Sequence, residues 1–498
     1  MGWHYAALED RLARLGHLEG ALAILNWDTA VCMPEAASAA RGEQIATLKR
    51  LAHELLTADE TGELLAGAEA ESDLDPWQRA NVREAQRRFR RARALEPALV
   101  EALARATNAC EMTWREARRR SDFAMLRASL EEVVRLVREA ARVTGAALGL
   151  EPYDALLDEH QPDLRDALVA PLLDRLAAAL PPILEVAIEA NRPFLTPRGP
   201  FPVDRQKKLA ERLLSRLGFD FRMGRLDASA HPFCGGIPVD IRITSRWRED
   251  EVGAALMAVL HETGHALYEA GLPRRWLGQP VGEARGIVVH ESQSLLLEMQ
   301  ICRSPAFLRF LAGELEAAFG PDPAWTSANL EALWHRVERG FIRVDADEVS
   351  YPLHVILRWR LEKAMLAGEL AVADLPGAWA EGMRALLGVS PPDDARGCLQ
   401  DIHWPVGAFG YFPCYTLGAL LAAQLAAAAR AQLPGLEQDI ARGDIAPLLA
   451  WLRAQVHGRG SLPRFEELVR EATGGPLAVE PFLEHLRARY LERAAAAA

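Results

Sequence analysis

The spacing of apolar residues is the feature that most strongly limits what this chain can fold into. Over most of the 498 residues, apolar side chains recur every three or four positions among Arg and Glu, as in helices that bury one face. The pattern predicts helices at 3–22, 36–57, 77–91, 97–119, 122–149, 205–217, 251–270, 285–303, 326–340, 349–367, 415–432, 463–473 and 479–496.

One short region has a different pattern. The segments FDFRMGRLD (219–227) and IPVDIRIT (237–244) alternate apolar and polar residues and carry β-branched side chains, which indicates a small sheet or hairpin. This region directly precedes the predicted helix 251–270. We therefore expect a mostly α-helical protein with a small β-sheet beside that helix.

The overall charge and the cysteine pattern narrow the class of protein. The chain has 57 basic and 69 acidic residues, and its net charge of −12 disfavours nucleic acid as a partner. We find neither a signal-like start nor an uncharged apolar run of the roughly 18 residues that a membrane span needs. The six cysteines form no CxxC pair and are predicted to be reduced, buried thiols. These features predict a cytoplasmic globular protein without a membrane partner.

The segment HETGH (261–265) has the pattern of a catalytic metal site. His261 and His265 are four residues apart, so both imidazoles leave one face of a helix and can share a metal. Glu262 lies one step round the helix and can reach a metal-bound water without being a ligand. The preceding apolar run VGAALMAVL places the motif inside the protein.

A catalytic zinc site needs a third protein ligand. The metzincin continuation is excluded, because Tyr268 and Gly271 stand where that motif has Gly and His. Glu291 is the preferred ligand, since it lies in the apolar run GIVVHESQSLLLEMQ and a buried carboxylate needs a partner. Glu269 lies on the HETGH helix and is expected to point away from the metal. The other candidates are Glu283, His290 and Glu298.

Beyond HETGH, several further motifs resemble those of the carboxypeptidase Taq family of zinc metallocarboxypeptidases, and the resemblance covers nearly the whole chain. The motifs are LNWDTAVCMPEAASAARGEQ (25–44), HPF (231–233), DIRIT (240–244), HETGH, HESQS (290–294), IRVDAD (342–347) and GCLQDIHW (397–404). Their number and order make coincidence negligible.

The resemblance implies an activity and a set of residues for it. His261, His265 and Glu291 would hold Zn²⁺, with Co²⁺ as an alternative, and Glu262 would be the general base for attack by a metal-activated water. The substrates would be short peptides with a free C-terminus, cleaved with broad specificity but with proline disfavoured. Family members typically form homodimers.

The resemblance also suggests substrate contacts. Arg343 in IRVDAD would bind the terminal carboxylate, with Arg242 in DIRIT as the second choice. Asp240 and Thr244 would line the closed end of the groove, and His231 would contact substrate or be structural. Donors to the oxyanion are expected from His403, Tyr411 and Tyr415, although each tyrosine could instead be a core residue. Asp345, Asp347 and Asp401 are candidates for orienting the ligand imidazoles.

The fold that the resemblance implies is a two-lobed, neurolysin-like helical metallopeptidase with a deep groove. Residues 1–498 would form one catalytic unit, with the motifs concentrated at about 231–418. Two alternatives remain: an oligoendopeptidase of the thimet type, and a non-catalytic peptide-binding protein. Glu262 argues against the second, because a structural metal site has no use for it.

Overall fold

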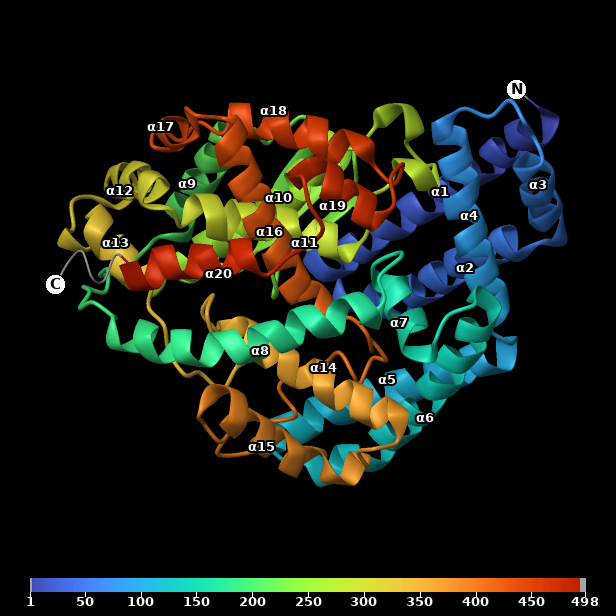
Figure 1. Cartoon of the computed structure of the whole chain (residues 1–498), viewed down its shortest axis with the longest axis horizontal. Helices are drawn as coiled ribbons and strands as arrows, with labels where there is room; N and C mark the ends of the chain where they lie inside the picture. The colour runs from blue at the N-terminus through green and yellow to red at the C-terminus, as the bar shows by residue number, and fades with distance from the viewer. Residues whose placement is uncertain (1, 493–498) are drawn as a thin grey trace.

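The computed structural model describes residues 2–492, which fold mainly into helices (Figure 1) and also form one small sheet. Before the sheet lie α1 (Trp3–Val31), α2 (Ser38–Thr57), α3 (Asp59–Glu69), α4 (Pro76–Ala94), α5 (Pro97–Arg120), α6 (Phe123–Leu148), α7 (Pro152–His160), α8 (Asp166–Glu189) and α9 (Val203–Arg216). After it follow α10 (Gly253–Gly271), α11 (Ile287–Leu295), α12 (Pro305–Phe319), α13 (Ser327–Trp334), α14 (Tyr351–Ala367), α15 (Leu375–Leu387), α16 (Phe412–Gln432), α17 (Leu436–Ile440), α18 (Ala446–Gln455), α19 (Phe465–Thr473) and α20 (Glu480–Leu486).

Local sequence signals explain where several helices begin and end. Asp75 caps α4 by accepting a hydrogen bond from the backbone N–H of Gln78, whose side chain accepts from the N–H of Asp75 in return. Asp122 caps α6, which ends at Gly149 in the left-handed conformation. Two helices continue as π-helices: α11 into Leu296–Cys302 and α20 into Arg487–Glu492.

The sheet supports the helix that carries HETGH. Its strands are β1 (Gly224–Ala228), β2 (Phe233–Ile237) and β3 (Asp240–Ser245), in the order β1-β3-β2. The central strand β3 pairs in parallel with β1 and antiparallel with β2. Ile241 and Ile243 of β3 are buried in one cluster with Val259 and Ala266 of α10. The sheet therefore holds one side of α10 in place.

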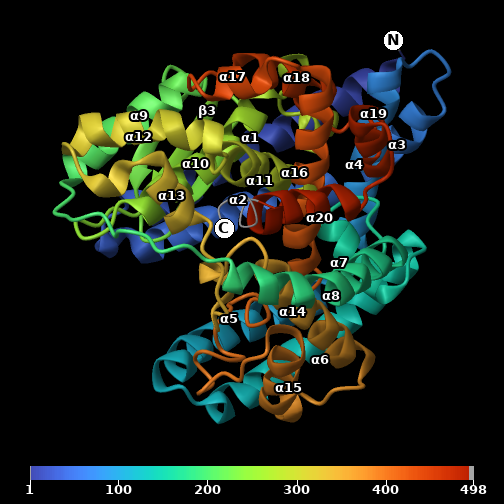
Figure 2. The same cartoon turned by 60° about the vertical axis from the view of Figure 1, so that its left-hand side comes forward.

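Helix α16 runs through the middle of the molecule and contacts α11, α14, α19 and α20 (Figure 2). In this view α5, α6 and α15 lie below α14, whereas α9, α10 and α12 lie above it. By length and composition, α8 and α16 could each cross a membrane. The apolar window of α16 is 78% buried, as a central core helix requires, whereas that of α8 is 33% buried.

The prediction of a mostly α-helical fold with a small sheet beside the HETGH helix is confirmed. Other details differ: the sheet has three strands, and the helix predicted at 326–340 ends at Trp334. The end of the helix predicted at 479–496 lies outside the described residues. All six cysteines are free, as expected, but Cys32 is exposed and Cys234 is only partly buried, contrary to the expectation that all six thiols are buried. Helices α3, α7, α8, α12, α15, α17 and α18 were not predicted.

Candidate metal centre and substrate cavity

Two glycines let the three helices of the candidate site approach closely. Gly264 lies in HETGH on α10, and a side chain there would clash with the backbone of Gln293 and Ser294 on α11. Gly418 lies on α16, and a Cβ there would lie 2.8 Å from the Cβ of Glu291. The small residues at these crossings therefore bring Glu291 against the two histidines.

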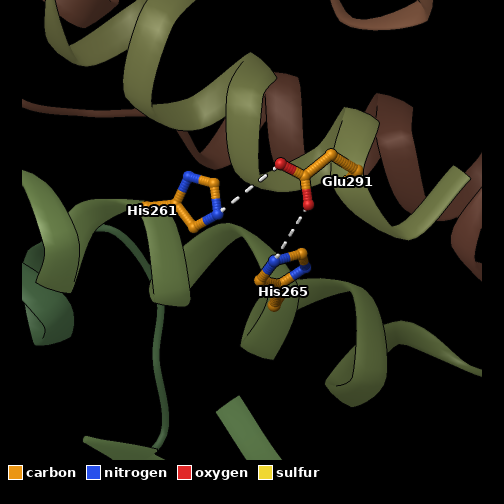
Figure 3. Close-up of side chains that lie close together, drawn as sticks. All are labelled: His261, His265 and Glu291. Atoms are coloured by element: carbon orange, nitrogen blue, oxygen red, sulfur yellow. Dashed lines mark ion pairs between the residues drawn. The ribbon is translucent and has the colours of Figure 1, made fainter. Parts of the chain in front are cut away.

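The structure brings His261, His265 and Glu291 together (Figure 3). Nε2 of His261 lies 3.9 Å from Oε1 of Glu291, and Nε2 of His265 lies 3.7 Å from its Oε2. One ligand atom from each residue fits within 4.8 Å of the others. This is the spacing that a shared metal ion requires.

Glu298 orients the first histidine. Its Oε2 lies 3.0 Å from Nδ1 of His261, and its Oε1 accepts a hydrogen bond from Arg303 at 2.5 Å. A carboxylate on one imidazole nitrogen fixes the tautomer and directs the other nitrogen toward the metal. His261 Nε2 is thereby directed toward Glu291.

A histidine and a carboxylate orient the second ligand. Nδ1 of His265 lies 2.6 Å from Nδ1 of His290, and Nε2 of His290 lies 2.8 Å from Oε1 of Glu269. If His290 donates to Glu269, its Nδ1 accepts from His265, and Nε2 of His265 stays free to bind a metal. Glu269 therefore points away from the metal position, as expected, but orients His265 through His290.

These contacts replace the carboxylates expected to orient the imidazoles. Asp347 accepts from the backbone N–H groups of Val349 and Ser350 before α14, and Asp345 is exposed. Asp401 holds Arg343 and Arg358. The expectation concerning these three aspartates was wrong, because Glu298 and His290 are nearer along the same helices that carry the ligands.

The donor set fits a divalent metal with catalytic rather than structural coordination. Two imidazoles and one carboxylate are the three protein ligands typical of open zinc sites, which keep a position for water or substrate. Glu262 sits beside them on α10, is only 8% exposed and lines the adjoining cavity. Burial raises the pKa of its carboxyl to about 7, which suits a group that takes and returns a proton near neutral pH.

A cavity of about 480 Å³ adjoins this site. It lies between α10, α11 and its π-helical extension, α16, and the segment that leads into α14. His261, Glu262 and Glu291 line one part of its wall, and Arg343, Tyr351 and Tyr415 line another. The cavity therefore brings a cation and two phenols into the same space as two of the candidate metal ligands.

Arg343 is buried and firmly held, yet it keeps free donors. Its Nε and Nη2 donate to Oδ1 of Asp401 at 3.0 and 2.8 Å, and its Nη1 donates to the hydroxyl of Tyr351 at 2.7 Å. A guanidinium has five N–H donors. Nη1 and Nη2 therefore each retain one N–H without a partner among residues 2–492, and these two donors are available to a carboxylate.

Asp401 is itself held by a second buried arginine. Arg358 donates its Nε to Oδ2 of Asp401 at 2.6 Å and its Nη2 to Oε1 of Gln400 at 2.6 Å. The same Gln400 oxygen accepts from the backbone N–H of Arg343 at 2.8 Å. Asp401 and Tyr351 raise the pKa of Arg343 although burial opposes this, so the guanidinium stays charged.

Of the predicted oxyanion donors, only Tyr415 lines the cavity. Nε2 of His403 lies 3.1 Å from its hydroxyl, and Tyr411 packs against its ring at 5.2 Å. Burial lowers the pKa of His403 to about 4, so its imidazole is neutral, and burial raises the pKa of Tyr415. His403 and Tyr411 thus contact Tyr415 but do not line the cavity themselves.

The substrate contacts predicted from DIRIT lie on β3 and are not among the residues that line the cavity. Arg242 donates two hydrogen bonds to Asp240 and lies 4.3 Å over the ring of Trp27. The buried Thr244 accepts from the backbone N–H of Phe233 at 3.1 Å. His231 is exposed, and its neighbour Pro232 reaches the cavity.

The sequence analysis considered Glu298 only as a candidate metal ligand, and it gave Tyr351 and Arg358 no role. Glu298 lies seven residues after Glu291, so the helical repeat places it on the same face as the ligand. Tyr351 and Arg358 carry no comparable signal, because their partners come from other segments. Their roles follow only from the folded arrangement.

Comparisons with known proteins agree over nearly the whole chain. The family model for carboxypeptidase Taq (M32) metallopeptidase matches residues 7–490. The chain belongs to this family. Thermostable carboxypeptidase 1 of Thermus thermophilus is 41% identical over 484 residues, which cover 95% of this chain and 94% of that protein.

Solved structures show the same fold. Metallocarboxypeptidase 1 of Trypanosoma cruzi aligns with a TM-score of 0.97 and 38% identity, covering 98% of this chain and 99% of that one. The M32 carboxypeptidase of Deinococcus radiodurans aligns with a TM-score of 0.94 and 37% identity over 99% and 100% of the two chains. The fold and family predictions are confirmed, and membership implies a metallocarboxypeptidase that uses a divalent metal.

Glu298→Gln tests the orienting contact on His261. The amide keeps the shape but loses the charge, so metal affinity is expected to fall by about 10- to 100-fold. Chelator competition at fixed pH would measure this change. The exposed Glu316→Gln, on α12, is the control and should bind metal like the parent. Unchanged affinity in Glu298→Gln would contradict an orienting role.

Proposed function

We propose that this protein is a zinc-dependent carboxypeptidase, with cobalt as an alternative metal, that removes C-terminal residues from short peptides. The supporting observation is that one cavity is lined both by His261 and Glu291, which form a triad with His265, and by Arg343 with its free N–H donors. A terminal carboxylate on Arg343 would present the last peptide bond to the metal side of the cavity. Broad specificity, with proline disfavoured, is the expectation carried over from the family resemblance.

Each residue has a defined task in the proposed reaction. A divalent metal held by His261, His265 and Glu291 would polarise the scissile carbonyl and acidify water. Glu262 takes the proton of the attacking water and delivers it to the departing amine. The hydroxyl of Tyr415 donates a hydrogen bond to the developing oxyanion, and neutral His403 holds that phenol in place. Arg343 holds the substrate in register throughout.

The remaining expectations extend this proposal. Peptides with a free C-terminus are the proposed partners, and a net charge of −12 supports the expectation that nucleic acid is not one. Homodimer formation, a cytoplasmic location and the absence of a membrane partner remain predictions. So does the single catalytic unit over residues 1–498.

The alternatives differ in what they require of the cavity. A thimet-type oligoendopeptidase cuts internal bonds and has no need of a fixed cation for a terminal carboxylate. A peptide-binding protein has no need of Glu262. The buried Arg343 and the buried Glu262, both in one cavity, favour a carboxypeptidase over either alternative.

The test compares an N-blocked tripeptide as the free acid and as its C-terminal amide. Release of the terminal residue is followed with metal-loaded enzyme, with chelator-stripped enzyme, and after zinc or cobalt is restored. We expect cleavage of the free acid alone, lost on stripping and regained with metal. Equal cleavage of the amide would identify an oligopeptidase, and binding without cleavage would identify a peptide-binding protein.

A further inference from the structure

The cavity continues along α16 past the level of Arg343. Tyr415, Ala419 and Ala422 line it, and their spacing of four and three residues places them on one helix face. At 1.5 Å per residue, Ala422 lies about 10 Å along the axis from Tyr415. The guanidinium carbon of Arg343 lies 4.9 Å from the ring of Tyr415, so the carboxylate site is at the near end of this stretch.

The opposite wall runs in the same direction. Glu291, Leu295, Met299 and Gln300 line the cavity in order along α11 and its π-helical extension. Glu291 packs against Gly418 at the metal end, whereas the carbonyl of Gln300 accepts from Arg430, further along α16, at 3.1 Å. The far end, which we call the inner end, is bounded by Gln300, Ala419, Ala422 and Phe482.

The charges near the inner end are already paired. Arg303 donates to Glu298 at 2.5 Å. Glu348 accepts from Arg489 and Tyr490, each at 3.0 Å, and lies 2.8 Å from Nε2 of His485. A charged group entering this end would find no unpaired opposite charge among residues 2–492, and burying it would be costly.

Gln300 is the exception among the polar groups at the inner end. It is only 2% exposed and lines the cavity, yet its carboxamide has no hydrogen-bond partner within the part of the chain that the structure describes. A buried amide normally has partners. This amide is therefore available to a ligand, and it offers both donors and an acceptor.

We propose that the inner end is the pocket for the side chain of the C-terminal residue, and that Gln300 determines its specificity. This inference rests on the proposed carboxypeptidase function. With the carboxylate on Arg343, the terminal side chain extends into the 10 Å stretch beyond it. The small side chains of Ala419 and Ala422 leave room for long residues, and the paired charges favour uncharged ones such as Leu, Met and Phe.

The first test changes the charge of Gln300. N-blocked dipeptides ending in Ala, Leu, Phe and Lys are compared by kcat/KM with metal-loaded enzyme. The parent is expected to prefer Leu and Phe over Lys. Gln300→Glu is expected to raise the Lys-to-Leu ratio at least tenfold, because its carboxylate can pair with the lysine ammonium. Gln438→Glu, an exposed change of the same kind, should leave the ratio unaltered.

The second test fills the pocket. Ala422→Leu is expected to lower kcat/KM for Phe and Leu at least tenfold relative to Ala, whereas Ala427→Leu on the exposed face of α16 should not. Melting temperature and metal content report whether each variant folds. Unchanged ratios in Gln300→Glu, or an equal loss for all four peptides in a folded Ala422→Leu, would overturn the pocket assignment. Failure of the parent to cleave any free acid would instead overturn the proposed function, and the pocket with it.

Discussion

Glu262→Gln is expected to lower kcat by about 10³-fold while the protein keeps its metal, since general acid–base groups contribute 10²–10⁴-fold. The amide has the shape of the carboxylate but cannot take a proton from water. Glu262 is buried beside the triad without belonging to it, so its replacement leaves His261, His265 and Glu291 in place. KM should change little, because the substrate carboxylate is held elsewhere.

The measurement combines steady-state kinetics on a free-acid peptide with metal analysis of the same preparation. The exposed Glu316→Gln on α12 is the matched control and should behave like the parent. A Glu262→Gln enzyme with full metal and full activity would show that the proton is carried by another group. Loss of metal in this variant would instead make Glu262 part of the coordination.

Arg343→Ala is expected to lower kcat/KM for free-acid peptides by about 10²- to 10³-fold, mainly through KM. Removing one partner of a buried, hydrogen-bonded charge pair costs about 2–5 kcal/mol, and each 1.4 kcal/mol is a factor of ten. Asp401 retains its hydrogen bond from Arg358, so the surrounding network keeps one cation. Metal content should stay close to that of the parent.

Two further variants make this prediction specific. Arg343→Lys keeps the charge but not the fork and should give an intermediate loss. Arg242→Ala removes the second candidate, which already pairs with Asp240 and stacks on Trp27, and should leave KM nearly unchanged. Normal kinetics for Arg343→Ala together with a large loss for Arg242→Ala would move the carboxylate site to β3.

The fold class could be predicted from the chain because helical periodicity is a local property. Apolar residues at three- and four-residue spacing define most of the helices, and the alternation around β3 marks the sheet. Helix α8 escaped this reasoning, since Pro171, Pro181 and Pro182 lie inside it. Its buried stripe of Leu173, Leu176 and Leu180 outweighs the cost of those prolines. That balance depends on packing against other helices.

The residues of the candidate site, too, fall into those that local sequence predicts and those that only tertiary packing positions. The sequence by itself determined the positions of His261, Glu262 and His265, because 3.6 residues per turn place the two histidines on one face and the glutamate beside them. Glu291 followed from the cost of burying a carboxylate without a partner.

Only the tertiary structure decided which groups hold these residues and where a substrate can lie. The pairing of Asp401 with Arg343 and Arg358 joins segments 58 and 43 residues apart in the chain. The unpaired amide of Gln300 becomes informative only once α16 and α20 close the cavity around it. Partners of this kind are chosen by three-dimensional proximity, which the spacing of residues along one helix does not encode.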